Sequence, residues 1–237
     1  MAANSLGVAY WRYYGAPHEK IMICPYYSNY VRIDEARAGS RADIMQGIGL
    51  TPDDKYLYSA ARLVPAKGLE LMIKAFLAGG YAAKGWKYVI AGIGPLEAEL
   101  KALAKTGGPE AERAIMFIGF QQPTQNLSVM AHASMLALPS RFEPHGIVVA
   151  ESLAAGTPVL ASDITGAAHD LVKHGVNGVI FRSEDQKDLE TKLAEALQAD
   201  KLAALRAASR PAFEEWYRRS SPIKVVPEVV GRMLALK

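Results

Sequence analysis

The 237-residue sequence has a single cysteine, Cys24, and this scarcity excludes several kinds of site. One thiol cannot form a disulfide within the chain, and it cannot supply the thiolates of a structural zinc site. No stretch reaches the ~18 apolar residues that a membrane-spanning helix needs. No signal peptide is recognisable either, because Arg12 interrupts the apolar character early. These absences predict a soluble protein of a reducing, cytoplasmic compartment.

An excess of one charge is also missing. The chain has 27 Lys and Arg against 24 Asp and Glu, a formal net charge of +3, and its basic residues are spread along the sequence. This distribution does not predict a nucleic-acid partner. It leaves a weak attraction to anionic membrane surfaces, and so peripheral membrane association, open. The five histidines include no H-E-x-x-H spacing of the kind that holds zinc.

What the sequence does have is a regular alternation of strand and helix patterns. Short apolar runs are each followed by a longer helical pattern, which is typical of a parallel sheet covered on both faces. We therefore expect an α/β fold with one Rossmann-like, doubly wound parallel sheet of about six strands. The strand patterns lie at residues 20–25, 55–61, 86–92, 114–120, 135–139, 158–162 and 177–181.

The two ends of the chain differ from this pattern. Residues 26–45 lack a clean period, and we expect a loop there that leads into a short helix. Residues 211–237 predict two helical pieces after the last strand, and Trp216 and Tyr217 within them need something to cover them.

One carboxylate stands in an unexpected place. The stretch "RFEPHGIVVAESLAAGTPV" (141–159) predicts a helix over residues 146–155 that stops at Gly156, just before Pro158. This helix is apolar almost all round, so it should be buried. Burying an unpaired carboxylate costs several kcal/mol. Glu151 must therefore reach the rim of the domain or have a partner, and the hydroxyl groups of a ligand would be suitable.

The same stretch offers further groups for a ligand. The free N–H groups of Gly146, Ile147 and Val148 at the helix start would suit a phosphate, and Glu143 in the preceding loop would face the same crevice. The alternative is a chance spacing of two glutamates, with Glu143 solvated and Glu151 paired with a lysine.

Two cations follow the strand pattern at 55–61. Arg62 and Lys67 flank the short loop before the helix that begins near Gly68, at the carboxyl end of a parallel strand. There they could converge on a diphosphate, Arg62 as a planar fork and Lys67 as a point charge. The alternative is that both are ordinary solvated loop cations.

A glycine turn follows the next strand pattern, in "IAGIGPLEAEL". Gly92 and Gly94 match the start of a dinucleotide-binding fingerprint, but Glu97 occupies the third glycine position. An NAD-dependent oxidoreductase would rest on these two glycines alone. We interpret them instead as residues that let the backbone approach a ligand or turn tightly.

Taken together, these stretches resemble the family 4 retaining glycosyltransferases, which have the GT-B fold of two Rossmann-like domains facing a cleft. Five motifs occur in the family's order: "ARLVPAKGLELMIKAF", "VIAGIGPLEAEL", "MFIGFQ", "LPSRFEPHGIVVAESLAAGTPVLAS" with the E-x7-E signature, and "NGVIF". The resemblance covers roughly residues 10–200, all of it in the C-terminal, nucleotide-sugar-binding domain of that family.

The resemblance implies a role for each candidate residue. Arg62 and Lys67 would bind the donor diphosphate and stabilise the leaving group, in place of a metal ion. Glu151 would bind the ribose hydroxyls, and Glu143 the hydroxyls of the transferred sugar. The remaining contacts to the nucleotide sugar would come from Gly92, Gly94, His145, Gly146, Ile147 and Val148. No metal and no cofactor are implied, and the donor substrate would be linked to UDP or GDP.

The chain also departs from the family. The family often has phenylalanine at the position of His145 and glutamate at the position of Asp170, so the sugar side of the pocket is expected to differ. No sequence for an N-terminal acceptor domain is present. We expect residues 1–25 to be an interdomain linker with a first strand, residues 26–210 the donor-binding domain, and residues 211–237 helices that pack on an acceptor domain or a second chain.

The sequence thus predicts the donor-binding domain of a retaining hexosyltransferase that moves a sugar from a nucleotide sugar to an acceptor hydroxyl. A non-catalytic module that binds a nucleotide sugar or a protein remains the alternative from another class. The NAD-dependent oxidoreductase is a third possibility, and an epimerase or phosphorylase with the GT-B fold is the last.

Overall fold

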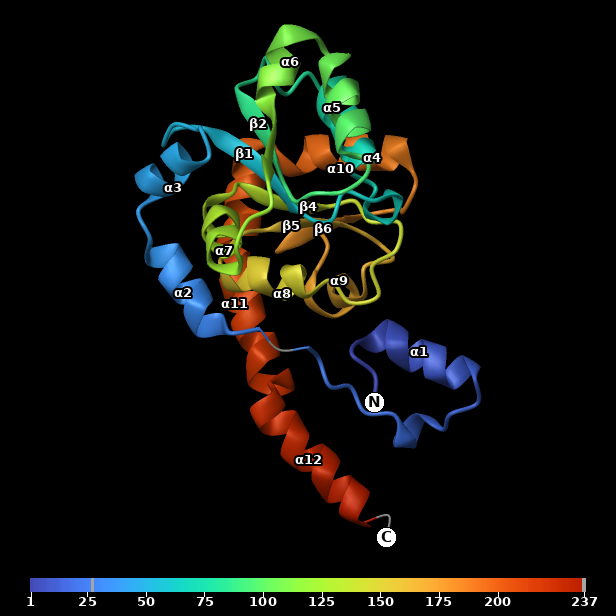
Figure 1. Cartoon of the computed structure of the whole chain (residues 1–237). Helices are drawn as coiled ribbons and strands as arrows, with labels where there is room; N and C mark the ends of the chain where they lie inside the picture. Colours follow the sequence, from blue (N-terminus) through green and yellow to red (C-terminus); the bar gives the residue numbers. More distant parts are fainter. Residues whose placement is uncertain (27, 236–237) are drawn as a thin grey trace.

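The domain is built on a six-stranded parallel sheet with helices on both faces (Figure 1). The computed structural model describes residues 1–26 and 28–235. The strands are β1 Lys55–Ala60, β2 Trp86–Ala91, β3 Ile115–Gly119, β4 Met135–Leu138, β5 Val159–Ser162 and β6 Gly178–Phe181. They match six of the strand patterns in the sequence, so the predicted α/β fold is confirmed.

The helices follow the strands in alternation, as the sequence predicts. They are α1 Ser5–Tyr13, α2 Tyr30–Ala38, α3 Arg41–Gly47, α4 Leu69–Ala78, α5 Glu97–Lys105, α6 Gly108–Ala114, α7 Pro123–His132, α8 Ile147–Ala154, α9 Gly166–Leu171, α10 Gln186–Ala196, α11 Ala199–Ser220 and α12 Pro222–Ala235, with short 3-10 turns η1 His18–Lys20 and η2 Pro65–Lys67. No helix in the described residues is both long and apolar enough to cross a membrane.

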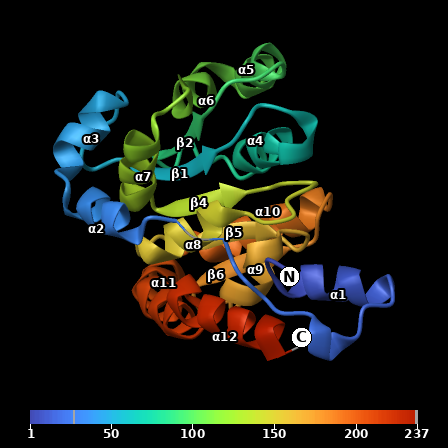
Figure 2. The ribbon, with the colours of Figure 1, turned by 60° about the horizontal axis from the view of Figure 1, so that its bottom comes forward.

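Alternate side chains of each strand enter two separate hydrophobic cores. Figure 2 shows the helices that cover the two faces of the sheet. In β1, Tyr56 and Tyr58 pack with α2, α7, α8 and the end of α11 on one face, while Leu57 packs with α4, α5 and α10 on the other. All three side chains are fully buried. Burial on both faces explains why the strands read as continuous apolar runs rather than as alternating ones.

The strand order, β3-β2-β1-β4-β5-β6, reverses direction between β1 and β4. β2 pairs with one edge of β1 and β3 pairs with β2, whereas β4 pairs with the other edge of β1 and is followed outward by β5 and β6. The helices that follow these two strands, α4 after β1 and α8 after β4, therefore lie on opposite faces of the sheet. In open α/β sheets this switch point, outside the carboxyl ends of the strands, is where ligands bind.

The strand expected at residues 20–25 is wrong. This segment forms only one isolated bridge, in which Ile23 pairs with Ala2, next to the turn η1. Pro17 and Pro25 bracket the run, and a proline cannot donate to a sheet ladder. The segment before it forms the helix α1, which packs on α9 and which the sequence did not predict.

Residues 30–47 form two helices, α2 and α3, where the sequence predicted a loop and one short helix. Tyr30, Ile33 and Ala36 are the buried residues of α2, and their spacing of three places them on one helical face. Only two turns carry this signal, which is too short to stand out as a period. Tyr27, within the expected loop, lies outside the described residues.

The predicted helix start at residue 211 is also wrong, because α11 runs without interruption through Pro211. Trp216 and Tyr217, for which the sequence demanded cover, pack against the core beside Phe213 and Tyr30. The next helix, α12, extends away from the sheet in Figure 1. Val226, Val230 and Leu234 recur on it every four residues and are exposed.

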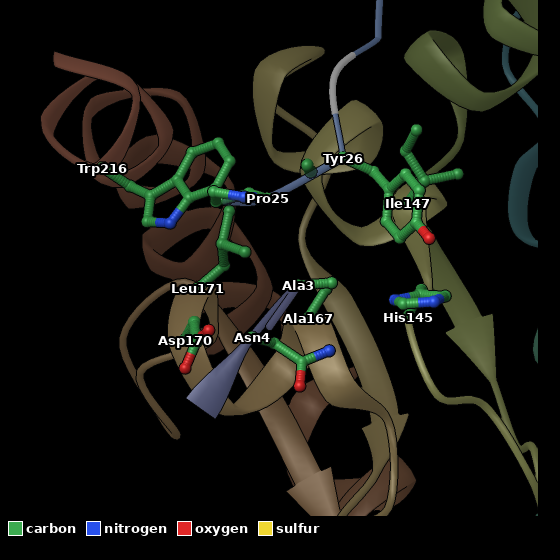
Figure 3. Close-up of a pocket in the computed structure, with 11 residues that line it drawn as sticks. Ala3, Asn4, Pro25, Tyr26, His145, Ile147, Ala167, Asp170, Leu171 and Trp216 are labelled. Carbon is green, nitrogen blue, oxygen red and sulfur yellow. The ribbon is translucent and has the colours of Figure 1, made fainter. Parts of the chain in front are cut away.

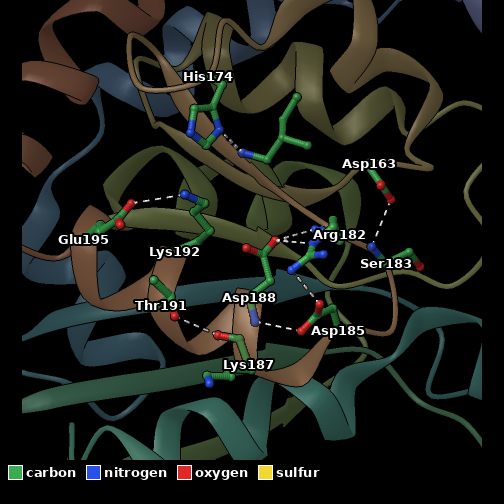
Figure 4. A network of polar contacts seen from close by, with 11 residues as sticks. Asp163, His174, Arg182, Ser183, Asp185, Lys187, Asp188, Thr191, Lys192 and Glu195 are labelled. Atoms are coloured by element: carbon green, nitrogen blue, oxygen red, sulfur yellow. Dashed lines mark hydrogen bonds and ion pairs between the residues drawn. The ribbon is translucent and has the colours of Figure 1, made fainter.

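The turn from β6 into α10 is held by a polar network (Figure 4). Asp185 caps α10 by accepting a hydrogen bond from the Asp188 N–H at 2.9 Å, and Arg182 pairs with Asp185 at 2.9 Å. The Ser183 N–H donates to Asp163, which follows β5, at 2.9 Å. These charges satisfy the free N–H groups of a helix start and one another, so we interpret this network as structural.

Candidate functional site

The loops after β1 and β4 lie in direct contact at the carboxyl edge of the sheet. Gly68 has a positive φ of 59°, and an added Cβ there would lie 2.1 Å from the carbonyl oxygen of Pro139. The Arg141 N–H donates to the carbonyl of Ala66 at 2.8 Å. Only glycine allows so close an approach, and it brings the charges of the two loops within reach of each other.

Two of the predicted site residues meet here. The Lys67 ammonium lies 2.5 Å from a carboxylate oxygen of Glu143, and their side chains are 24% and 14% exposed. Glu143 therefore has a cationic partner and is not simply solvated. Because an ammonium has three donors, Lys67 can hold Glu143 and still donate to a second anion.

The third predicted charge, Arg62, lies at the edge of a cavity of about 430 Å³. The cavity is formed by the ends of β1 and β2, the loop after β3 and the start of α7. Arg62 is exposed and makes no salt bridge with the described residues. Its guanidinium is therefore available to an anion at the cavity mouth.

The two glycines of the second turn are needed by the fold. An added Cβ at Gly92 would lie 1.9 Å from the carbonyl oxygen of Ala61, and one at Gly94 would lie 2.4 Å from that of Leu63. Gly92 also has a φ of 133°. Both residues thus let the β2–α5 turn press against the loop that carries Arg62. Only Gly92 of the two lines the cavity among the described residues.

Glu151 lies within α8 and has a partner that the sequence did not predict. The Ser28 hydroxyl donates to its Oε1 at 2.6 Å. Burial raises the pKa of Glu151 above its ordinary value of 4.5, and the hydrogen bond from Ser28 acts in the opposite direction. The other carboxylate oxygen, Oε2, accepts no hydrogen bond from the described residues, so it is available to a ligand hydroxyl.

The helix that carries Glu151 starts where the sequence predicted. Gly146 caps it in a left-handed conformation, with φ 73° and ψ 52°, and Gly156 follows its end with φ 78°. The N–H groups of Gly146, Ile147 and Val148 donate to no acceptor within residues 1–26 and 28–235. Such N–H groups at a helix start are suited to bind an anion.

A second, smaller cavity of about 30 Å³ lies beside His145 (Figure 3). The His145 ring packs against Tyr26, 4.2 Å between centroids, and its Nδ1 is buried without a partner among the described residues. Asp170 accepts hydrogen bonds from the Ser5 N–H, the nearer at 3.0 Å, and so anchors α1. This volume holds a water molecule or two but not a nucleotide.

The structure thus gathers Lys67, Glu143, the N–H groups of residues 146–148, Arg62 and Gly92 along one edge of the sheet. Glu151 accepts a hydrogen bond from Ser28, and in the described part of the chain it forms no hydrogen bond or ion pair with Lys67 or Glu143. In the same part of the chain no group of three or more His, Cys, Asp and Glu is placed to hold a metal ion.

Sequence reasoning missed Ser28 and the polar residues Gln121 and Asn126 that line the large cavity. Gln121 follows β3 as Arg62 follows β1, so the rule that ligands bind beyond strand ends could have found it. No sequence pattern indicated Ser28, because the loop that contains it has no hydrophobic period and its partner Glu151 lies 123 residues away.

The sequence profile described as "Glycosyl transferases group 1" matches residues 40–210 of the chain. This range includes the two facing loops, the large cavity and α8. The chain belongs to this glycosyltransferase family. The family assignment confirms the general class that the five motifs predicted.

Individual glycosyltransferases of the family are similar over most of the chain. The D-inositol 3-phosphate glycosyltransferase of Nocardia farcinica is 28% identical over 215 residues, which are 86% of this chain and 46% of that protein. The alpha-D-kanosaminyltransferase of Streptomyces kanamyceticus is 27% identical, over 83% of this chain and 50% of that protein. The chain therefore spans about half the length of these relatives.

Solved structures share the fold of this chain. Anabaena Alr3699/HepE in complex with UDP and glucose superposes with a TM-score of 0.80 at 19% identity, covering 99% of this chain and 62% of that one. WaaG, a glycosyltransferase involved in lipopolysaccharide biosynthesis, has a TM-score of 0.77 at 21% identity, with 97% and 60% covered. These matches confirm the Rossmann-like sheet of the GT-B fold.

Proposed function

We propose that this chain is the donor-binding, C-terminal domain of a retaining family 4 glycosyltransferase. The observation that carries the proposal is the ion pair between Lys67 and Glu143, 2.5 Å apart, in the loops on either side of the switch point. It places a cation for a phosphate and a carboxylate for sugar hydroxyls side by side. The free N–H groups at the start of α8 follow in the same loop.

The donor would lie along this edge of the sheet. Arg62, Lys67 and the N–H groups of residues 146–148 would surround the diphosphate, with His145 and Gly92 at its sides. Glu151 would accept hydrogen bonds from the ribose through the oxygen that Ser28 leaves available. Glu143 would bind hydroxyls of the transferred sugar. Gly94 supports this site from behind, through its contact with Leu63.

In the reaction, the oxygen of an acceptor hydroxyl forms a bond to the anomeric carbon of the sugar. The bond from that carbon to the diphosphate oxygen breaks, the nucleoside diphosphate leaves with the electron pair, and the proton of the hydroxyl passes to an oxygen of the leaving diphosphate. Negative charge grows on the leaving phosphate in the transition state. Fixed cations and N–H groups stabilise that charge, so Arg62 and Lys67 supply what a metal ion supplies elsewhere. In a retaining enzyme the acceptor binds to the face that the nucleotide leaves.

Two observations on similar proteins support the proposal. The two relatives are named as sugar transferases, and the Anabaena structure contains UDP and glucose. A donor linked to UDP or GDP, used as a substrate without a further cofactor, agrees with the groups on the edge of the sheet. Because the relatives are about twice as long, we expect the acceptor to bind to a further domain or chain, in the cytoplasm or at the membrane surface.

Calorimetric titration of the purified chain with UDP, GDP and NADH tests this proposal. We expect saturable binding of a nucleoside diphosphate and no binding of NADH. The Glu151→Ala variant should bind the same diphosphate at least about tenfold more weakly. Glu99→Ala, at an exposed position of α5, is the matched control and should bind like the wild type. A folded wild-type chain that binds neither diphosphate would contradict the proposal.

A further inference from the structure

The large cavity has two apolar side chains at its mouth that the fold does not explain. Ile93, in the turn after β2, is 57% exposed, and Phe120, directly after β3, is 63% exposed. Both line the cavity, and they come from adjacent loops at the same edge of the sheet. A planar ring between them would cover both side chains, and stacking of a nucleobase on an aromatic ring contributes about 1–3 kcal/mol.

Two side-chain amides line the cavity, and their hydrogen bonds within the fold leave Gln121 as an acceptor and Asn126 as a donor. The Gln121 side-chain N–H donates to the carbonyl of Ile118 at 2.7 Å, which orients the amide so that its oxygen is left to accept. The Tyr58 hydroxyl donates to the Asn126 side-chain oxygen at 2.6 Å, which leaves the Asn126 amide N–H groups to donate. Burial raises the pKa of Tyr58, so this hydroxyl keeps its proton.

These groups distinguish the two bases that the proposed function leaves open. Uracil has one N–H, at N3, between two carbonyl oxygens. Guanine has a ring N–H next to an exocyclic amine, an edge that is matched by a carboxylate or by two adjacent acceptors. The cavity has one side-chain acceptor, Gln121, with the donor Asn126, and no Asp or Glu among its described lining residues.

We propose that this cavity binds the base of the donor as uracil, with Gln121 accepting from N3–H, Asn126 donating to a ring carbonyl, and Ile93 and Phe120 covering the ring. The inference rests on the proposed function, because Arg62 at the edge of the cavity is what connects the base to the diphosphate site. The choice of uracil is an inference about this chain in particular, because it depends on the side chains of Phe120, Gln121 and Asn126, which follow β3.

Parallel titrations of the purified chain with UDP, GDP and ADP test the inference. We expect UDP to bind at least about tenfold more tightly than GDP or ADP, since a mismatched base leaves polar groups unpaired. If GDP or ADP bound more tightly than UDP, the base assignment would be wrong while the donor-site proposal stood. If none bound, both would fail.

A second test compares the ratio of UDP affinity to GDP affinity between variants, so it does not depend on the affinity for either nucleotide alone. In Gln121→Glu, a carboxylate faces the uracil carbonyls and matches the guanine edge, so the UDP-to-GDP affinity ratio should fall at least about tenfold. Gln122→Glu makes the same change at the next residue, which is exposed and outside the cavity, and should leave the ratio unchanged. Equal ratios in the two variants, with both still folded, would overturn the role of Gln121.

Discussion

The ion pair between Lys67 and Glu143 makes a prediction about stability that needs no ligand. The atoms lie 2.5 Å apart, and the two side chains are 24% and 14% exposed. Exposed ion pairs contribute up to about 1 kcal/mol, whereas breaking a buried pair costs about 3–5 kcal/mol. This pair lies between those limits. We therefore expect Lys67→Met, which leaves the carboxylate without its cation, to lower the free energy of unfolding by about 1–2 kcal/mol.

A double-mutant cycle isolates the interaction from the other effects of each substitution. Lys67→Met, Glu143→Gln and the double variant would be unfolded in urea and followed by circular dichroism. We expect a coupling energy of about 1 kcal/mol, so that the double variant loses less than the sum of the single ones. Lys74→Met, at an exposed position of α4, should change stability by no more than about 0.5 kcal/mol. Strictly additive losses would show that the two side chains do not interact.

Three further perturbations have expected outcomes. Gly92→Ala should lower the free energy of unfolding by about 3 kcal/mol or more, measured by urea unfolding, because the new Cβ would lie 1.9 Å from the Ala61 carbonyl oxygen. Glu151→Gln should raise the free energy of unfolding at pH 7, because the raised pKa of Glu151 means that its ionised carboxylate destabilises the fold above pH 4.5. In urea unfolding at several pH values this gain should shrink as the pH falls towards 4.5, and a gain that did not change with pH would show that ionisation of Glu151 is not its cause. Arg62→Ala should weaken calorimetric UDP binding about tenfold, whereas Arg113→Ala, exposed on α6, should not change it.

The sequence predicted those parts of the fold that depend on local patterns. Six strands could be recognised because they are buried on both faces, and the bounds of α8 followed from Gly146 and Gly156, whose backbone conformations favour glycine. The strand expected at residues 20–25 was wrong because strand formation depends on a neighbouring strand to pair with. That segment has only one bridge, to Ala2.

The candidate site could be predicted in its charges but not in its contacts. Residue types at strand ends indicated Arg62, Lys67 and Glu143. That Lys67 lies against Glu143 depends on β1 pairing with β4 and on the close approach at Gly68, which are non-local features. The same holds for Ser28, whose partner Glu151 lies in another element. Glu151 was noticed only because a carboxylate is out of place on a buried helix.

A crystal structure of the chain with UDP would show directly whether the donor nucleotide lies along the carboxyl edge of the sheet, as we propose. We expect the diphosphate between Arg62, Lys67 and the start of α8, the ribose hydroxyls on Glu151, and the uracil in the cavity beside Gln121. UDP bound on another surface of the domain, with none of these contacts, would show that the assignment is wrong.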